Sequence, residues 1–242
     1  MINIYYGPQI THPLRPIWEP LEPLSKSIKS FHKDIDQETL GKCPSFAEHV
    51  KKTYVIKCPC DGAMYRNQEP NKSPKWIAKF STPMDIGMGN RKLSSTPEDE
   101  KFDESMSQIL NDNFYLFFAD KSVKIRMTPP YLHHGKVFGV AGDYDIGKWF
   151  RPLSIATFCD ATVESPIFFK KGDPLAYVSF DTQEKYKLIE VDWPEKVFSF
   201  VKICTDYKQM VQFQPLRNVY DFFVRNGWRR HILAMAKEAA IK

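Results

Sequence analysis

A series of short apolar runs after residue 112 constrains the fold of this 242-residue chain more than any other feature. Gly, Pro, Asp and Asn separate the runs at short intervals. The six runs cover residues 113–120, 123–130, 136–145, 149–158, 165–180 and 185–193. This spacing is typical of sandwiches and barrels built from antiparallel strands. We therefore expect a mainly β fold with C-terminal helices, in the form of a jelly-roll-like β-sandwich or barrel.

Proline content and helical spacing divide the rest of the chain. Residues 1–25 contain five prolines, which exclude a stable helix and predict an extended, Pro-rich arm. Apolar residues in the arm, such as Trp18, indicate that it lies along the body or a neighbouring subunit. Residues 194–242 carry apolar residues at helical spacing and predict a helical segment packed on the β domain. The β domain is expected to span 26–193, with an exposed, mobile loop near 90–105.

Charge and cysteine content bear on the class of protein. The chain has 34 Lys and Arg against 29 Asp and Glu, a net charge of +5. Because the basic residues do not form one dense stripe, nucleic acid is not an expected partner. Five cysteines, an odd number in a chain of this length, disfavour a disulfide framework. Without a signal-peptide pattern or an apolar stretch of roughly 20 residues, we expect a soluble protein, neither secreted nor membrane-bound.

Three cysteines are the first candidates for a metal site. Cys43, Cys58 and Cys60 lie within 18 positions, and His49 is the nearest residue that could complete a zinc tetrahedron. Zinc knuckles separate paired ligands by two or more residues, whereas Cys58 and Cys60 are separated only by Pro59. The alternative is that the cysteines are small buried apolar side chains. On that interpretation no cofactor is expected.

A second candidate metal site lies in the stretch YLHHGKVFGVAGDYD. His133 and His134 precede Asp143 and Asp145, and two His with one carboxylate can bind iron. With His231 as the later histidine, such a site would make the protein an Fe/2-oxoglutarate-type oxygenase. Those enzymes carry a His-x-Asp pair that this chain lacks. The competing interpretation is a polar hairpin with two turns.

Two short stretches resemble the dUTPase and dCTP-deaminase family. DYDIGKW, residues 143–149, is similar to the Asp-Tyr-x-Gly turn that leads a strand of that family, and KKGDPLAYVSF, residues 170–180, is similar to its Gly-Asp-x-Ile-Ala-Gln strand. The resemblance implies a jelly-roll-like body. It also implies an alternative function, a nucleotide-processing hydrolase whose pocket is lined by Asp143, Asp145 and Arg151.

The chain departs from this family where the chemistry would be expected. Pro174 and Tyr177 stand where the family has a basic residue and a Gln, and no Arg-Ser phosphate-binding motif precedes them. A triphosphate needs several converging donors and a carboxylate-held Mg²⁺. The resemblance therefore favours the scaffold over the catalysis.

Taken whole, the chain also resembles conserved proteins carried by tailed phages of marine cyanobacteria. The stretches that carry this resemblance are CPSF (43–46), YVIKCPCD (54–61), FRPLSI (150–155) and KKGDPLAYVSF (170–180). The resemblance implies a phage-encoded product and no particular activity.

These observations lead to one main functional hypothesis with two alternatives. The main hypothesis is a non-enzymatic binding protein of a phage, either a structural or accessory component of the virion or an effector of a host protein. Its partner would be another protein or a second copy of itself, in the host cytoplasm or the virion. The Pro-rich arm, the exposed loop and the aromatic content of 14% fit such contacts. The alternatives are the hydrolase and the oxygenase described above.

Overall fold

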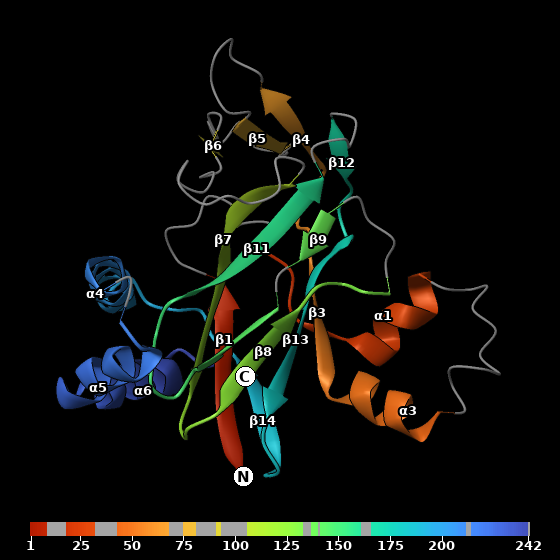
Figure 1. The fold of residues 1–242 in the computed structure, drawn as a ribbon. Coiled ribbons are helices and arrows are strands. Elements are labelled where there is room, and N and C mark those ends of the chain that lie inside the picture. Colours follow the sequence, from red (N-terminus) through yellow and green to blue (C-terminus); the bar gives the residue numbers. More distant parts are fainter. Residues whose placement is uncertain are drawn as a thin grey trace.

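The computed structural model describes residues 1–8, 18–31, 43–67, 75–80, 91–92, 106–132, 137–139, 141–160, 166–211 and 214–241. Within these residues the chain forms three β-sheets and two groups of helices (Figure 1). The first group is α1 (Leu24–Phe31) and α3 (Pro44–Lys51). The second group is α4 (Val197–Met210), α5 (Leu216–Arg225) and α6 (Trp228–Glu238).

Sheet A has the strand order β14-β1-β7-β11-β9. Its strands are β14 (Tyr186–Glu190), β1 (Ile2–Pro8), β7 (Met106–Ala119), β11 (Pro152–Asp160) and β9 (Val137–Gly139). β1 pairs in parallel with β14, and the other pairs of the sheet are antiparallel. The N-terminal strand therefore lies inside the sheet, beside a strand from the far end of the β region.

Sheet B has the order β10-β8-β13-β3-β2, and sheet C the order β12-β4-β5-β6; all their pairs are antiparallel. The strands of sheet B are β10 (Gly142–Asp145), β8 (Lys124–Thr128), β13 (Pro174–Asp181), β3 (Thr53–Lys57) and β2 (Glu22–Pro23). Those of sheet C are β12 (Ile167–Phe169), β4 (Gly62–Asn67), β5 (Lys75–Phe80) and β6 (Arg91–Lys92).

Sheets A and B face each other across a shared hydrophobic core, and β7 shows how this core is built. Alternate residues of a strand point to opposite faces of its sheet. The ring of Phe117 contacts Phe180 of β13 at 6.1 Å between centroids, whereas Phe118 contacts Phe223 of α5 at 6.0 Å. Both faces of β7 are thus buried here, by sheet B on one side and by the C-terminal helices on the other. A strand segment buried on both faces has a continuous apolar sequence, as residues 115–119 of β7 do.

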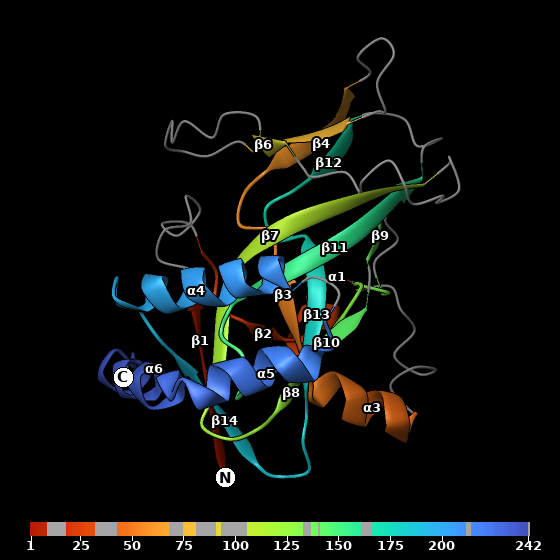
Figure 2. The same cartoon turned by 60° about the vertical axis from the view of Figure 1, so that its left-hand side comes forward.

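The outer face of sheet B is covered by α1 and α3. Val55 and Tyr177 of this sheet form a second buried cluster with Leu24 of α1 and Val50 of α3. Ile56, the residue after Val55, belongs instead to the core shared with sheet A. The body therefore has four layers: helices α4–α6, sheet A, sheet B, and helices α1 and α3 (Figures 1 and 2).

The predicted β-rich fold with C-terminal helices is confirmed, and a jelly roll is not. Each of the six apolar runs contains at least part of a strand. The strands that the structure describes form open sheets without a closed barrel. Gly227, between α5 and α6, has a φ of 67°, and this left-handed conformation favours Gly at the break between the two helices.

The N-terminal residues differ from the expected arm. Residues 2–8 form an interior strand because no proline precedes Pro8, so every residue before it keeps the N–H that a strand pair needs. A Cβ at Gly7 would overlap the carbonyl oxygen of Val191, so this close approach requires glycine. Trp18, further along the expected arm, does lie against the body, with its ring 5.4 Å from that of Tyr115.

Strands β5 and β6 of sheet C lie within residues 66–113, a polar stretch that the sequence predicts as loop. β5 alternates Lys75, Ile77 and Lys79 with Trp76, Ala78 and Phe80, and this alternation could have predicted a strand. Residues 93–105, which hold most of the predicted mobile loop, lie outside the described residues. In the described part of the chain, every helix is too short or too polar to span a bilayer.

Candidate functional site

Asp145, at the end of β10, is a buried carboxylate with both oxygens engaged. Its Oδ1 accepts hydrogen bonds from the backbone N–H groups of Val123 (3.2 Å) and Gly147 (2.9 Å). Its Oδ2 accepts a hydrogen bond from the Ser122 hydroxyl (2.5 Å) and forms an ion pair with Lys148 (3.1 Å). Such partners are what make a buried carboxylate tolerable. Asp145 thus fastens the turn before β8 to the turn after β10.

Asp143 and Arg151, the other residues of the predicted nucleotide pocket, lie near the same place. Asp143 is exposed, and its Oδ2 is 3.7 Å from the Lys124 ammonium nitrogen. The Arg151 guanidinium lies over the ring of Tyr144, 5.0 Å from its centroid. The charge of each residue therefore has a partner within the protein.

Tyr220 of α5 contacts Asp145, although the sequence marks it only as part of an apolar helical stripe. Its hydroxyl accepts a hydrogen bond from the backbone N–H of Asp145 (2.8 Å). Burial raises the pKa of Tyr220 and outweighs the hydrogen bond from the Asp145 backbone, which lowers it; the carboxylates of Asp145 and Asp143 raise the pKa further, and Arg151 lowers it. No local pattern links Tyr220 to a residue 75 positions earlier. The contacts of this cluster hold α5 and β10 together, which is a structural role.

The cysteines lie in two different environments. Cys43 is exposed at the start of α3, whereas Cys58 and Cys60 are buried. The Cys58 thiol donates to the carbonyl of Cys60 (3.0 Å). Burial raises the pKa of Cys58 to about 12 and also raises that of Cys60. Among the described residues, no group of three His, Cys, Asp or Glu side chains could hold a metal ion.

Of the histidines proposed for the iron site, only His231 lies in the described part of the chain. His133 and His134 lie outside it, so the iron site built on them stays a prediction. His231 is on α6, where its ring stacks on Phe200 of α4 with centroids 6.5 Å apart. It therefore contributes to the helical surface described below.

His49, weighed above as a zinc ligand, instead contacts a tyrosine. Its Nε2 is 2.5 Å from the hydroxyl oxygen of Tyr131, and the two groups share a hydrogen bond. The Tyr131 ring meets Tyr177 edge to face at 5.1 Å between centroids. These contacts link α3 to the loop after β8 and extend the second buried cluster to the surface.

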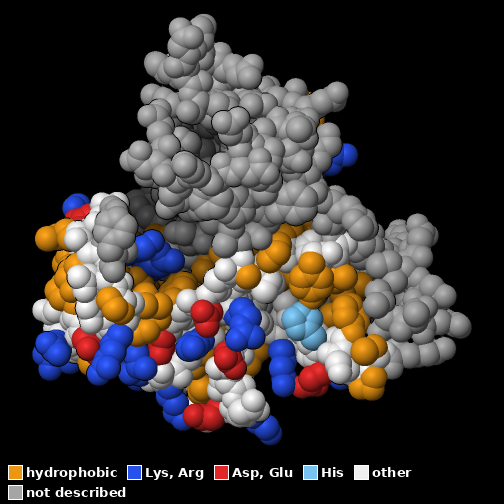
Figure 3. Space-filling view, viewed as in Figure 1, with side chains coloured by type: hydrophobic (Ala, Val, Ile, Leu, Met, Phe, Trp, Pro, Cys, Tyr) orange, Lys and Arg blue, Asp and Glu red, His pale blue; other side chains and the backbone are white. Residues whose placement is uncertain are grey.

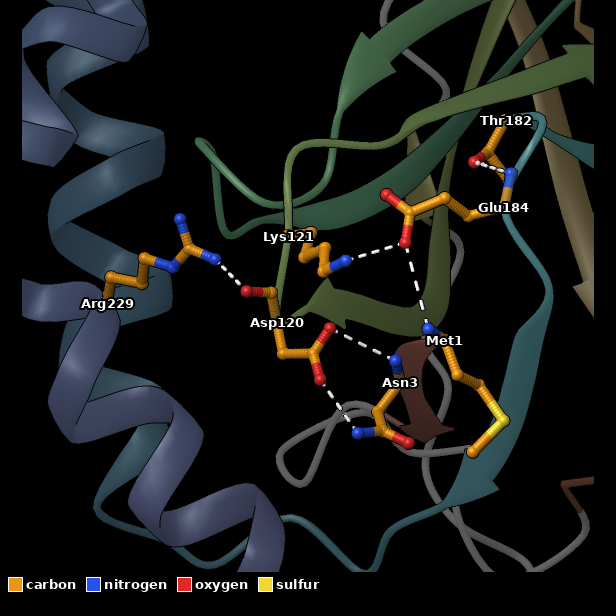
Figure 4. Close-up of polar contacts among 7 residues, drawn as sticks. All are labelled: Met1, Asn3, Asp120, Lys121, Thr182, Glu184 and Arg229. Atoms are coloured by element: carbon orange, nitrogen blue, oxygen red, sulfur yellow. Dashed lines mark hydrogen bonds and ion pairs between the residues drawn. The ribbon is translucent and has the colours of Figure 1, made fainter.

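A second polar cluster uses one of the two adjacent arginines of α6 (Figure 4). The Arg229 guanidinium donates to the backbone carbonyl of Asp120. The Asp120 carboxylate accepts hydrogen bonds from the backbone N–H (3.0 Å) and side-chain amide (2.7 Å) of Asn3. Beside it, Lys121 pairs with Glu184 at 2.6 Å. Arg229 thus fastens α6 to the turn after β7 and, through Asp120, to β1, whereas its neighbour Arg230 is exposed.

Helix α4 has a second apolar stripe in addition to its buried one. Val197, Val201 and Cys204 are buried in the shared core. The second stripe is continued by aromatic rings of α5 and α6. We call this surface the helical seam; its members are Phe200, Ile203, Tyr207 and Met210 of α4 with Phe222 and Trp228.

Within the helical seam, aromatic stacking is combined with exposed aliphatic side chains. Tyr207 and Phe222 stack in parallel with centroids 3.6 Å apart, and Phe200 meets Trp228 edge to face at 6.3 Å. Ile203 is 40% exposed and Met210 is 83% exposed. The sequence shows apolar spacing in this helix, but it does not tell which apolar residues face the core. Only the docking of α4 on sheet A separates the two stripes.

The helical segment also carries all of the net charge of the protein. Residues 194–242 contain nine Lys and Arg against four Asp and Glu, whereas residues 1–193 contain 25 of each. Figure 3 shows the helices at the left, where apolar side chains lie beside a group of Lys and Arg side chains. The helical segment is thus both basic and partly apolar at its surface.

Comparison with protein-family models, with curated proteins and with solved structures finds no match to this chain. Its function is therefore argued from the contacts and charges of its own residues.

Proposed function

We propose that this chain is a non-enzymatic, phage-encoded binding protein and that the helical seam contacts its protein partner. The observation that carries the proposal is the exposure of Ile203 and Met210 beside stacked aromatic rings. Exposed apolar side chains grouped with aromatic and Arg residues are characteristic of protein interfaces. In isolation each exposed side chain would need no explanation; here two lie on one stripe.

The origin and place of action of the protein are part of the same proposal. The resemblance to proteins of cyanobacterial phages supports a virion component or an effector of a host protein. We also infer that sheets A and B derive from a jelly-roll-like sandwich, a fold class that viral capsid proteins use. Two antiparallel-rich sheets that share one core support this relationship, and the parallel β1–β14 pair is a departure from it.

Site-specific photo-crosslinking in extracts of an infected cyanobacterial host tests the proposal. A benzophenone amino acid would replace Ile203 or Met210 in the helical seam, or Lys187 on β14 as an exposed control. We expect an adduct of defined mass from the two seam positions and none from the control. An adduct of twice the protein's own mass would identify a second copy as the partner. No adduct, or the same adducts from all three positions, would contradict the proposal.

A further inference from the structure

The helical seam has the spacing with which one α-helix packs against another. Its α4 members, Phe200, Ile203, Tyr207 and Met210, are separated by three, four and three positions, as are the a and d positions of a heptad. Phe200 and Tyr207 already contact rings of α5 and α6. Ile203 and Met210, about 10 Å apart along the axis at 1.5 Å per residue, remain exposed for a further helix that would lie along α4.

Two exposed arginines border this stripe. Arg230 has its Nε 3.3 Å from Nε2 of His231, whose ring stacks on Phe200 of the helical seam. Arg225 follows Phe222 by three positions on α5, so the two are neighbours on one side of that helix. The helical seam is therefore flanked by positive charge, in a segment whose basic residues outnumber its acidic ones by five.

The charge and shape of this surface distinguish between classes of partner. A second copy bound through the same face would bring two basic surfaces together, which like-charge repulsion disfavours. A nucleic acid would use the arginines, but phosphate contacts leave Ile203 and Met210 without a role. An anionic bilayer would gain little from this surface, because Ile203 and Met210 offer it few apolar side chains to insert. An acidic amphipathic helix uses the apolar stripe and the arginines together.

We propose that the partner presents an amphipathic helix to the helical seam, with apolar side chains on one stripe and Asp or Glu beside it. The apolar residues would pack around Ile203 and Met210, and the carboxylates would pair with Arg225 and Arg230. Bidentate pairing with Arg adds orientation to the contact. This inference rests on the proposed function and names the chemistry of the partner.

A pair of synthetic peptides tests this inference with the full-length protein. The acidic probe has Leu at heptad positions a and d and Glu at e and g, and the basic probe has Lys in place of every Glu. Binding would be measured by fluorescence anisotropy at low and high salt. We expect the acidic probe to bind at least about ten times more tightly than the basic probe, a difference of about 1.4 kcal/mol in binding free energy. Its binding should weaken in high salt.

Three double variants locate the binding. Arg225→Glu with Arg230→Glu should weaken the binding of the acidic probe by about tenfold and strengthen the binding of the basic probe. Lys185→Glu with Lys187→Glu changes the net charge equally on exposed residues at β14 and should leave the preference unchanged. Ile203→Ser with Met210→Ser should weaken the binding of both peptides. Circular dichroism would verify that every variant is folded.

The opposite results would overturn the inference. These are equal binding of the two peptides, no binding of either, or the same loss in both charge variants. Tighter binding to phosphatidylcholine–phosphatidylglycerol vesicles or to oligothymidine than to the acidic probe would overturn it as well, in favour of a membrane or a nucleic acid. If photo-crosslinking at Ile203 finds a partner while the acidic probe fails, the proposed function stands and only this inference falls.

Discussion

The β body balances its acidic and basic residues, whereas the C-terminal helical segment carries an excess of basic residues. Residues 1–193 carry equal numbers of acidic and basic residues, and several of them pair across strands or turns, as Lys121 does with Glu184 and Arg126 with Asp181. The helical segment forms pairs within α4 and α5, between Lys202 and Asp206 and between Arg217 and Asp221, yet it keeps an excess of five basic residues.

The two regions also differ in how they place aromatic side chains. In the body, rings such as Phe117 and Phe150 are fully buried between layers. In the helical segment, Phe200 and Phe222 are only partly buried, beside Ile203, which is exposed. The body also exposes single rings, Phe168 and Tyr131, but its charges are balanced. The helical segment combines partly buried rings, exposed aliphatic side chains and excess positive charge on one surface, and we expect binding there.

The largest expected difference is in thiol reactivity, and it tests whether the helical segment stays docked on the body. Burial raises the pKa of Cys204 on α4, and that of Cys58 in the body, to about 12. At pH 8 the thiolate fraction of such a thiol is about three orders of magnitude below that of an ordinary cysteine. Iodoacetamide should therefore modify the exposed Cys43 first and the two buried thiols at least about a hundredfold more slowly.

Peptide mapping by mass spectrometry over a time course would measure these rates. Unfolding in urea should bring all three cysteines to similar rates, which serves as the control. If Cys204 reacts as fast as Cys43 while Cys58 stays protected, the helical segment opens independently of the body. In that case the body and the helical segment would also differ in rigidity, because the helical segment would undock while the body stays folded.

The next largest effect concerns two aspartates of one strand. Asp145→Asn replaces a buried acceptor with a group that carries two donors, so the N–H groups of Val123 and Gly147 compete for fewer acceptors. We expect a loss of about 3 kcal/mol in the free energy of unfolding. Asp143→Asn removes one exposed ion pair and should cost less than about 0.5 kcal/mol. Urea denaturation measures the free energy of unfolding of both variants. Equal losses would show that the contacts of Asp145 do not stabilise the body.

A third pair of variants separates the two stripes of α4. Val201→Ala removes a side chain that is 3% exposed in the core and should cost about 2 kcal/mol of stability. Ile203→Ala, two residues later in the helical seam, should change stability by less than about 0.5 kcal/mol. Thermal or urea unfolding would show this difference. Similar losses would mean that the helical seam serves the fold and would weaken its assignment as a binding surface.

The smallest effect is a pH dependence within the charge-balanced body. Burial of Glu22 by itself would raise its pKa, but contacts with Lys57 and Lys26 outweigh burial and hold the pKa below its usual value. A carboxyl whose pKa is lowered by folding stabilises the protein above its unfolded pKa, and this stabilisation is lost as the pH falls through the folded pKa. We expect a contribution below about 1 kcal/mol.

Urea unfolding of the wild type and of Glu22→Gln between pH 3 and pH 6 would measure this contribution, since the usual pKa of Glu is about 4.3. The two proteins should differ at pH 6 and converge toward pH 3. A constant difference across this range would show that Glu22 acts by packing and not by charge.

Much of the β body follows from local sequence, because a strand between turns leaves a signal within a few residues. The apolar runs and their Gly and Pro boundaries predicted strands across residues 113–193, and the turn at Gly172 and Asp173 has the positive φ that Gly allows. The placement of β1 could not be predicted in this way. Its partners β14 and β7 are distant in sequence, so only their pairing turned an expected arm into an interior strand.

For the candidate site, too, local sequence determined one part and contacts between distant elements determined the other. The sequence by itself determined that the chain is β-rich with a helical C-terminal end, that these helices carry the excess positive charge, and that Asp143, Asp145 and Arg151 occur close together along the chain. Only the tertiary structure decided that Tyr220 meets Asp145, and that Val201 faces the core while Ile203 faces outward. The physical reason is that periodicity shows that apolar stripes exist, whereas the surface each stripe meets depends on contacts between elements far apart in the chain.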